Sequence, residues 1–336
     1  MKRALFLFLL VAASIPSAAQ FPAVPDSVYA FIKRNNIFRN SINWQQTDAD
    51  FHACIRSSKT LNDTMNCFVN VLKQLNDVHS SFMINGRYYG HYNPLEDSVY
   101  KRIKPTRERA EAVTGMFYST VLEKKYGYLV VPAISAWGNE EINRYAQALH
   151  DTVCRLSSHT LGGFIIDLRL NSGGNMYPML AGLSSFLGNT AIGYETDIDN
   201  NVVRKWQIRN NDFFSNDYQA TSIKAACHTD NSQLPVVILT GPVTGSSGSM
   251  TAIAFKQRPR TYFIGEPTAD GYTTSNGFFQ YPPNLSINLA SYFVADRKMN
   301  VYRRTVDPDL LMYTTDNFGQ LMSDEKIKAA IAWLSK

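Results

Sequence analysis

The spacing of apolar residues changes along the chain and divides it into two regions. In the first, residues 27–37 and 64–75 carry apolar side chains at intervals of three and four, the repeat of a helix with one buried face. The whole stretch from about 24 to 78 is predicted to be helical. We therefore expect a small helical N-terminal domain over residues 20–85.

Further along, short apolar runs alternate with helix-type segments. The runs have the length and the β-branched content of buried strands. Strands are predicted at 128–132, 163–169, 236–240 and 261–265, and helices at 140–156, 176–187 and 250–255. Strand–helix–strand order is typical of layered α/β proteins. This pattern predicts an α/β domain over residues 86–336.

Turn and cap residues mark the ends of several predicted elements. Asn139 is expected to cap the helix that follows it, and Ser323 is expected to cap the closing helix. A hairpin is predicted over 278–295, turning at Pro282-Pro283-Asn284. Residues 86–115 are polar with little periodicity, so we expect a connecting loop with at most a short strand.

The first residues of the chain have the order of a secretory signal. Lys2 and Arg3 precede an apolar run at 4–13, and Ser17-Ala18-Ala19 offers small residues for cleavage before Gln20. The run is too short to cross a membrane, and no other stretch has the length and apolarity required. We expect residues 1–19 to be removed near Ala19-Gln20 and the protein to be exported to the periplasm or secreted.

Composition and charge exclude some classes of partner. Apolar residues make up 45% of the chain and charged residues 18%, as in ordinary globular proteins. Loss of Lys2 and Arg3 with the signal lowers the formal net charge from +5 to +3. Because this charge is small and dispersed, neither nucleic acid nor a membrane surface is an expected partner. The oligomeric state is left open.

Four cysteines could form disulfides in an exported protein. Cys54 and Cys67 are close enough in sequence to join neighbouring helices, which would leave Cys154 and Cys227 as the second pair. Three pairings are consistent with four cysteines, and the sequence does not choose among them. No CxxC or histidine-rich spacing indicates a metal site.

Candidate chemistry begins at residues 241–256, where small and hydroxyl residues lie between a predicted strand and a predicted helix. Such a turn can present a nucleophilic hydroxyl, here that of Ser246. The free N–H groups and positive dipole end of the helix would stabilise an anion formed beside it. The alternative is structural, because Thr244, Ser246 or Ser247 could simply cap the helix.

Two further stretches could contribute to the same site. His79 follows the last predicted helix of the N-terminal region, at a junction where side chains often face a cleft. Gly173 and Gly174 follow a predicted strand, and glycines there let backbone N–H groups approach a ligand closely. Each feature also has an ordinary explanation, a structural histidine in one case and a tight turn in the other.

The order of residues excludes one serine chemistry. An α/β-hydrolase places its histidine after the nucleophile and uses a G-x-S-x-G turn. No histidine follows His228, and Ser246 does not lie in such a turn. The order that remains has His79 as base before Ser246 as nucleophile.

Several separated stretches together resemble one family, the tail-specific or C-terminal processing serine peptidases, which include the core of tricorn protease. The matching stretches cover most of the chain in the family's order. They are Leu-Asn-Asp-Val-His-Ser at 75–80, Ile-Asp-Leu-Arg-Leu-Asn-Ser-Gly-Gly at 166–174, Thr-Gly-Ser-Ser-Gly-Ser at 244–249, Gly-Glu-Pro-Thr at 265–268 and Asp-Pro-Asp at 307–309.

This resemblance implies a crotonase- or ClpP-like α/β superhelical fold for the catalytic domain. It implies Ser246 as the nucleophile, with Ser247 as the lesser alternative. It also implies an oxyanion hole made by backbone amides at Gly173, Gly174 and Ser247. The tricorn-like members take their base from the Asp-x-His-Ser segment, which corresponds to His79.

The chain departs from the family's pattern in three ways. The place of the lysine base used by many members is Gly271, so a lysine base would have to come from elsewhere, for example Lys256. No PDZ domain separates residues 82 and 127, and Ser249 stands where the family usually has glutamate. The group that orients the proposed histidine base is open.

The candidates for that orienting group are Asp296, Asp307 and Ser80. The sequence thus predicts an exported serine endopeptidase that cuts flexible segments of peptides or unfolded proteins without a cofactor. Two alternatives remain, a catalytically inactive binding or scaffold protein on the same fold and a non-peptide acyl hydrolase.

Overall fold

The computed structural model describes residues 23–92, 94, 97–101, 117–224, 227, 229–281 and 284–336. The predicted signal at 1–19 lies outside these residues, as do Pro282 and Pro283 of the predicted hairpin turn. Much of the predicted connecting loop at 86–115 is outside them too. Its described part includes β2 (Arg87–Gly90), the short strand that the sequence allowed for.

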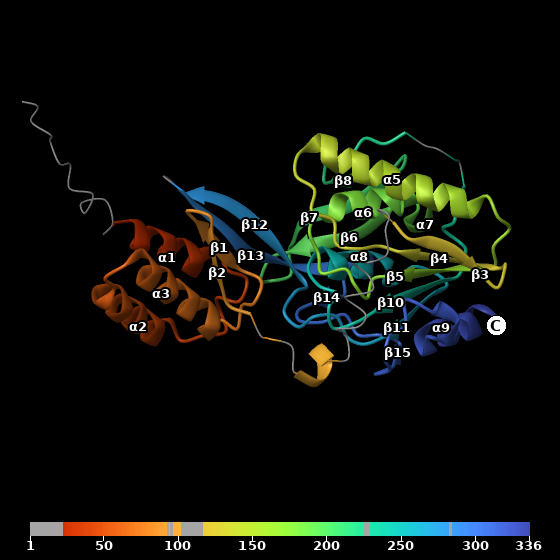
Figure 1. Cartoon of the computed structure of the whole chain (residues 1–336). Helices are drawn as coiled ribbons and strands as arrows, with labels where there is room; N and C mark the ends of the chain where they lie inside the picture. Colours follow the sequence, from red (N-terminus) through yellow and green to blue (C-terminus); the bar gives the residue numbers. More distant parts are fainter. Residues whose placement is uncertain are drawn as a thin grey trace, which may run out of the picture.

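The N-terminal part is helical, as predicted. It consists of α1 (Ala23–Asn35), α2 (Trp44–Ser57) and α3 (Leu61–Gln74). Their apolar faces form one core, to which Phe82 and three residues of a long strand, β13 (Leu285–Asp296), also contribute. Figure 1 shows these helices at one end of the molecule and the C-terminus at the opposite end.

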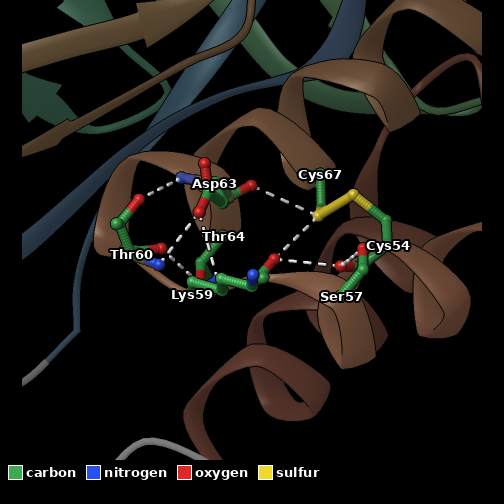
Figure 2. The surroundings of a disulfide bond; sticks show 8 residues. Cys54, Ser57, Lys59, Thr60, Asp63, Thr64 and Cys67 are labelled. Carbon is green, nitrogen blue, oxygen red and sulfur yellow. Dashed lines mark hydrogen bonds between the residues drawn. A yellow bond between two sulfur atoms is a disulfide. The ribbon is translucent and has the colours of Figure 1, made fainter.

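A disulfide between Cys54 and Cys67 joins α2 to α3 (Figure 2). Between the two cysteines, Thr60 and Asp63 form a capping box in which each side chain accepts a hydrogen bond from the other residue's backbone N–H. The second disulfide joins Cys154 to Cys227. The structure therefore selects one of the three pairings that the sequence left open.

A mostly parallel sheet forms the centre of the α/β body. Its strand order is β15-β11-β10-β5-β4-β3, and only β3 runs antiparallel to its neighbour. The strands are β3 (Ser119–Leu122), β4 (Tyr126–Val130), β5 (Gly163–Asp167), β10 (Val236–Thr240), β11 (Thr261–Gly265) and β15 (Leu310–Leu311). The predicted strands at 236–240 and 261–265 are confirmed without any change of bounds.

Helices cover both faces of this sheet. One face packs against α5 (Asn139–Ser157), α6 (Met176–Gly182), α7 (Ser184–Leu187) and α8 (Ser247–Phe255). The other face packs against α9 (Glu325–Leu334). Figure 1 shows α5 and α9 on opposite sides of the strands. The predicted α/β class is thus confirmed.

An antiparallel sheet connects the helical part to this body. Its order is β2-β1-β13-β6-β7-β8-β9, and β12 and β14 also pair with β13. The remaining bounds are β1 (Ser81–Ile84), β6 (Ala191–Thr196), β7 (Val202–Arg209), β8 (Asp212–Ser215), β9 (Tyr218–Gln219), β12 (Thr274–Tyr281) and β14 (Val301–Tyr302). Strand β13 pairs with β1 near its start and with β6 near its end, so it spans both parts.

Three local predictions were wrong. Gly138, not Asn139, is the N-cap of α5, and Asn139 is its first residue. Asp324, not Ser323, caps α9, because its carboxylate accepts from the N–H groups of the next turn. The single helix predicted over 176–187 is divided into α6 and α7 at Leu183. Among the described helices, none has both the length and the apolarity needed to span a membrane.

Candidate active site

Ser246 stands at the tight turn between β10 and α8, with φ 50° and ψ −123°. This conformation is strained for a residue other than glycine. Ser246 is the N-cap residue of α8, yet its hydroxyl makes no capping hydrogen bond. Gly173 allows this turn, since a Cβ at that position would lie 2.6 Å from the Cβ of Ser246.

His79 enters the site from the loop between α3 and β1. The buried carboxylate of Asp77 accepts the backbone N–H groups of His79 and Ser80 at 3.0 and 2.9 Å. The same carboxylate accepts the side-chain amide of Asn36 and the hydroxyl of Ser80. Asp77 therefore fixes the backbone of this loop and does not contact the imidazole, and desolvation raises the pKa of its carboxyl group.

The folded chain brings His79 and Ser246 together across 167 residues, with Nε2 of the imidazole 2.9 Å from the serine Oγ. The other ring nitrogen, Nδ1, lies 2.7 Å from Oγ1 of Thr274. That threonine hydroxyl donates its own proton to Oδ1 of Asn276 at 3.1 Å. It must therefore accept from Nδ1–H, which leaves Nε2 unprotonated and able to accept the serine proton.

Burial of the imidazole lowers the pKa of His79 to about 4, because desolvation disfavours its charged form. At neutral pH the ring is therefore uncharged, as a general base must be before it acts. The ring of Tyr272 contacts the imidazole edge-on, with the ring centroids 5.0 Å apart. The backbone carbonyl of Tyr272 accepts the N–H of Ser246.

Thr274 is the residue that contacts Nδ1 of the imidazole, and the three candidates from the sequence have other partners. Asp296 accepts the backbone N–H groups of the turn after β13, and Asp307 accepts the hydroxyl of Thr305. The hydroxyl of Ser80 donates to Asp77 and accepts from the N–H of Ala290. Thr274 belongs to none of the family-like stretches, and 195 residues separate it from the histidine. No signal in the sequence pointed to it.

Two backbone amides near the serine are candidates for binding an oxyanion. Neither the N–H of Gly174 nor that of Ser247 donates to another described residue. The N–H of Gly173, which the sequence also nominated, donates instead to Oδ1 of Asn171 at 3.0 Å. The hydroxyl of Ser247 donates to the carbonyl of Gly174 at 2.8 Å, which joins the glycine turn to the helix start. This bond occupies the proton of the alternative nucleophile.

The lysine candidates do not reach this site. The ammonium of Lys256 lies over the ring of Phe263 and donates to the carbonyl of Asp307 at 2.8 Å. At the place of the family's lysine, Gly271 has φ +82°, and a Cβ there would lie 2.5 Å from a methyl group of Val78. Even a small side chain would therefore displace the loop that carries the histidine. Ser249 is buried, with its hydroxyl 3.4 Å from the carbonyl of Thr244.

The charged residues of two other family-like stretches, 166–174 and 265–268, form buried ion pairs. Arg169 is buried and pairs with Asp167, Asp316 and Asp324 at 2.7, 2.7 and 2.8 Å. Lys326, also buried, pairs with Asp316 and with a glutamate from the Gly-Glu-Pro-Thr stretch. These ion pairs tie the ends of β5 and β11 to α9, so the acidic and basic residues of these stretches act in folding.

Two cavities include the serine in their lining. One has a volume of about 270 Å³ and is lined in part by Met176, Tyr177 and Met250. The other has a volume of about 650 Å³ and extends along β1 and β2 past Tyr88 and Tyr92. Both are lined by Ser246 and His79, so a bound chain that reaches the serine can also occupy these cavities.

Comparison with known proteins identifies the family of the chain. The model of peptidase family S41 matches residues 125–312, which is more than half of the chain. The nisin-resistance protein of Lactococcus lactis subsp. lactis is 26% identical over 280 residues, which are 82% of this chain and 78% of that protein.

Solved structures share the fold. A lipoprotein from Streptococcus agalactiae superposes with a TM-score of 0.67 at 23% sequence identity, covering 93% of this chain and 94% of the other. The photosystem II D1 C-terminal processing protease superposes with a TM-score of 0.53 at 13% identity, covering 86% and 92%. At such identities the comparison speaks for the fold alone.

Proposed function

The chain belongs to peptidase family S41 and is a serine-type peptidase, and from this premise we propose that it cuts peptide bonds with Ser246 as nucleophile and His79 as base. The observation that carries the proposal is the 2.9 Å contact between the serine Oγ and Nε2 of the imidazole. This contact supports the proposal because Thr274 accepts from Nδ1–H on the other side of the ring, which leaves Nε2 free to accept a proton.

The proposed reaction has two steps. In the first, Nε2 of His79 takes the hydroxyl proton while the Oγ of Ser246 attacks the carbonyl carbon. The N–H groups of Gly174 and Ser247 stabilise the negative oxygen that forms. The imidazolium then gives its proton to the leaving amine, and an acyl-enzyme remains. In the second step His79 takes a proton from water while the water oxygen bonds to the acyl carbon. The bond from that carbon to Oγ then breaks, the imidazolium returns its proton to Oγ, and the carboxylic acid leaves.

All of these groups come from the chain itself, so no cofactor is required by the proposal. Two cavities that share the serine favour an endopeptidase, because they offer space for a substrate that continues beyond the bond that is cut. Extended, flexible segments suit this arrangement, since a peptide backbone must lie along the cleft to reach the serine. Peptides and unfolded proteins are therefore the proposed substrates.

The same observations give less support to the two alternatives, an inactive scaffold and a non-peptide acyl hydrolase. An inactive scaffold would not need a strained serine that makes no cap, nor a histidine with a defined tautomer. A non-peptide acyl hydrolase would use the same pair of residues. The long cleft past Tyr88 and Tyr92 favours a polymer over a small ester.

We also propose that the protein is exported. The signal-type order of residues 1–19 supports this, and so do the disulfides Cys54–Cys67 and Cys154–Cys227, which use all four cysteines of the chain. Disulfides persist in oxidising compartments outside the cytosol. The similarity to a nisin-resistance protein makes nisin one peptide to include among the substrates tested.

The test is active-site labelling of the mature protein with a fluorophosphonate, followed by mapping of the labelled peptide by mass spectrometry. We expect labelling at Ser246 that is lost in Ser246→Ala and strongly reduced in His79→Ala. Ser247→Ala is the matched control and should still be labelled, because it keeps its backbone N–H. Labelling at Ser247, or equal labelling of the His79 variant, would contradict the proposal.

A panel of peptides and simple esters then separates the two hydrolase classes. We expect hydrolysis of peptides, dependent on Ser246, at internal bonds. Turnover of esters together with inertness toward every peptide, including nisin and denatured protein, would favour the non-peptide hydrolase.

A further inference from the structure

Two strongly exposed aromatic side chains touch each other at the active site. Trp137 and Phe278 are 67% and 66% exposed. Their rings nevertheless meet edge to face, with centroids 5.7 Å apart and planes at 90°. Trp137 lies in the loop before α5, whereas Phe278 lies on β12, so the contact joins two distant parts of the chain. Large apolar side chains placed together in solvent often mark a binding site.

The Trp137 ring is tied to the oxyanion side of the site. Ile134, three residues earlier, exchanges backbone hydrogen bonds of 3.1 and 2.7 Å with the glycine turn at 173–175. Asn175 also donates its side-chain amide to the carbonyl of Ala136. The loop that carries the tryptophan is therefore hydrogen-bonded to the turn that contains Gly174.

The Phe278 ring is tied to the histidine side. Phe278 is paired across the hairpin with Asn288, whose side-chain amide donates to the carbonyl of His79 at 3.3 Å. Asn276, two residues before the phenylalanine, donates to the same carbonyl at 2.9 Å. The two rings are thus anchored to opposite halves of the catalytic machinery.

The pair also belongs to the lining that the two cavities share. Trp137 and Phe278 line both of them, together with Ser246, His79 and Gly174. We propose that the two rings form an aromatic bridge across the cleft at the serine, and that this bridge admits a single extended peptide chain but holds back rings and folded segments. The inference rests on the proposed function, because it concerns the substrate of that same site.

The bridge is weak enough to be opened by substrate. An edge-to-face contact between exposed rings changes an equilibrium by a few-fold to about tenfold. A linear peptide can lie beneath the closed bridge, whereas a peptide ring must separate the two aromatic groups before its scissile bond reaches Ser246. The bridge should therefore appear as a preference for linear over cyclic peptides of the same sequence.

The experiment measures kcat/KM for one linear peptide and for the same peptide closed head to tail. We expect the wild-type protein to prefer the linear form about tenfold or more. Phe278→Ala and Trp137→Ala should each reduce this ratio to about threefold or less. The double variant should reduce it no further, because both substitutions remove the same contact.

Tyr218→Ala is the matched control, since Tyr218 is an aromatic residue that is 59% exposed but lies on β9 and lines neither cavity. It should leave the ratio unchanged. The inference is overturned if the bridge variants keep the wild-type ratio, or if they slow both peptides equally, which would show that the rings only add general binding surface.

Labelling rates with a small and a bulky fluorophosphonate separate this inference from the proposed function. In Phe278→Ala the labelling rate of the bulky probe should increase by a larger factor than that of the small probe. If the wild-type serine reacts with neither probe but the variant reacts, the bridge is supported as the barrier. If Ser246 is not labelled in any variant, the proposed function fails and the inference fails with it. Labelling with an unchanged ratio of the two rates contradicts the bridge alone.

Discussion

At the scale of single residues, one hydroxyl group decides which imidazole nitrogen is the base. Thr274 is buried, its proton is donated to Asn276, and its oxygen faces Nδ1 of His79. A carboxylate in this position would stabilise the imidazolium with a full charge, but a threonine does so only as a dipole. The site therefore combines a fixed tautomer with a weakly basic ring.

Thr274→Val removes the hydrogen-bond acceptor while it keeps the shape of the side chain. It removes the hydroxyl partner of Nδ1–H but keeps the backbone of Thr274, which also hydrogen-bonds to the imidazole. Loss of one hydrogen bond costs about 0.5–1.5 kcal/mol, so we expect kcat/KM to fall roughly 2- to 10-fold. Steady-state kinetics on a cleaved peptide checks this. Thr274→Ser should restore most of the activity, and a valine variant with full activity would show that the threonine does not orient the ring.

The dependence of activity on pH tests the state of His79. Its pKa is lowered to about 4 by burial, and the neutral form, which is the base, predominates above that pKa. We expect kcat/KM to be insensitive to this group from neutral pH down to about pH 5 and to fall by half near pH 4. A pH–rate profile on a peptide without ionisable side chains is the measurement. An acidic limb centred near pH 6.5 would indicate a solvated imidazole instead.

At the scale of elements, the catalytic pair depends on how two loops are held together. Arg304 follows β14 and pairs with Asp270, and it also donates to the carbonyl of Asn76 at 3.1 Å. Its own carbonyl accepts the N–H of Gly271. One residue thus links the loop that leads to the histidine with the loop whose Tyr272 carbonyl holds the backbone of the serine.

We expect Arg304→Gln to lower kcat about 5- to 10-fold with little change in KM, because the distance between base and nucleophile would be less well fixed. Stability should change by less than about 1 kcal/mol, since the ion pair with Asp270 is partly exposed to solvent. Peptide kinetics and urea unfolding provide the two measurements.

The neighbouring Arg303→Gln is the control for this prediction. Its guanidinium lies over the ring of Phe293 and donates to Asn200, away from the catalytic loops. It should leave kcat unchanged. Equal losses of kcat in the two variants would show a general effect of charge and contradict the positioning role of Arg304.

At the scale of the whole molecule, the site forms where two parts meet. The helical part and its following loop supply His79, the α/β body supplies Ser246 and the oxyanion amides, and the antiparallel sheet joins the two (Figure 1). Activity therefore requires that both parts and β13 be folded. The disulfides act on this larger scale because each closes a loop in the unfolded chain.

The two disulfides should differ in their effect on stability. Cys154–Cys227 closes 73 residues and Cys54–Cys67 closes 13 residues. Loop-closure entropy assigns about 4 kcal/mol to the first and about 3 kcal/mol to the second. We expect the Cys154→Ser/Cys227→Ser variant to lose more free energy of unfolding in urea than the Cys54→Ser/Cys67→Ser variant. The opposite order would show that local contacts of α2 and α3 outweigh chain entropy.

The sequence alone determined the features that depend on neighbouring residues. Buried strands such as β10 and β11 are visible in the sequence as apolar runs. The glycine turn and the serine turn are short stretches whose backbone conformation limits which residues can occupy them. The family-like stretches, which include His79 and Ser246, could therefore be found in order along the chain. Caps were missed by one residue, because neighbouring polar side chains such as Ser323 and Asp324 compete for the same N–H groups.

Only the tertiary structure decided which distant residues meet. The partner of the histidine, the pairing of the cysteines, the contact of Trp137 with Phe278 and the link through Arg304 all join positions far apart in sequence. Such contacts depend on the register of β12 and β13 and on the packing of two sheets, and neither leaves a periodic signal in the chain. The proposed nucleophile could thus be found from local chemistry, whereas the environment that leaves Nε2 of His79 unprotonated is a property of the fold.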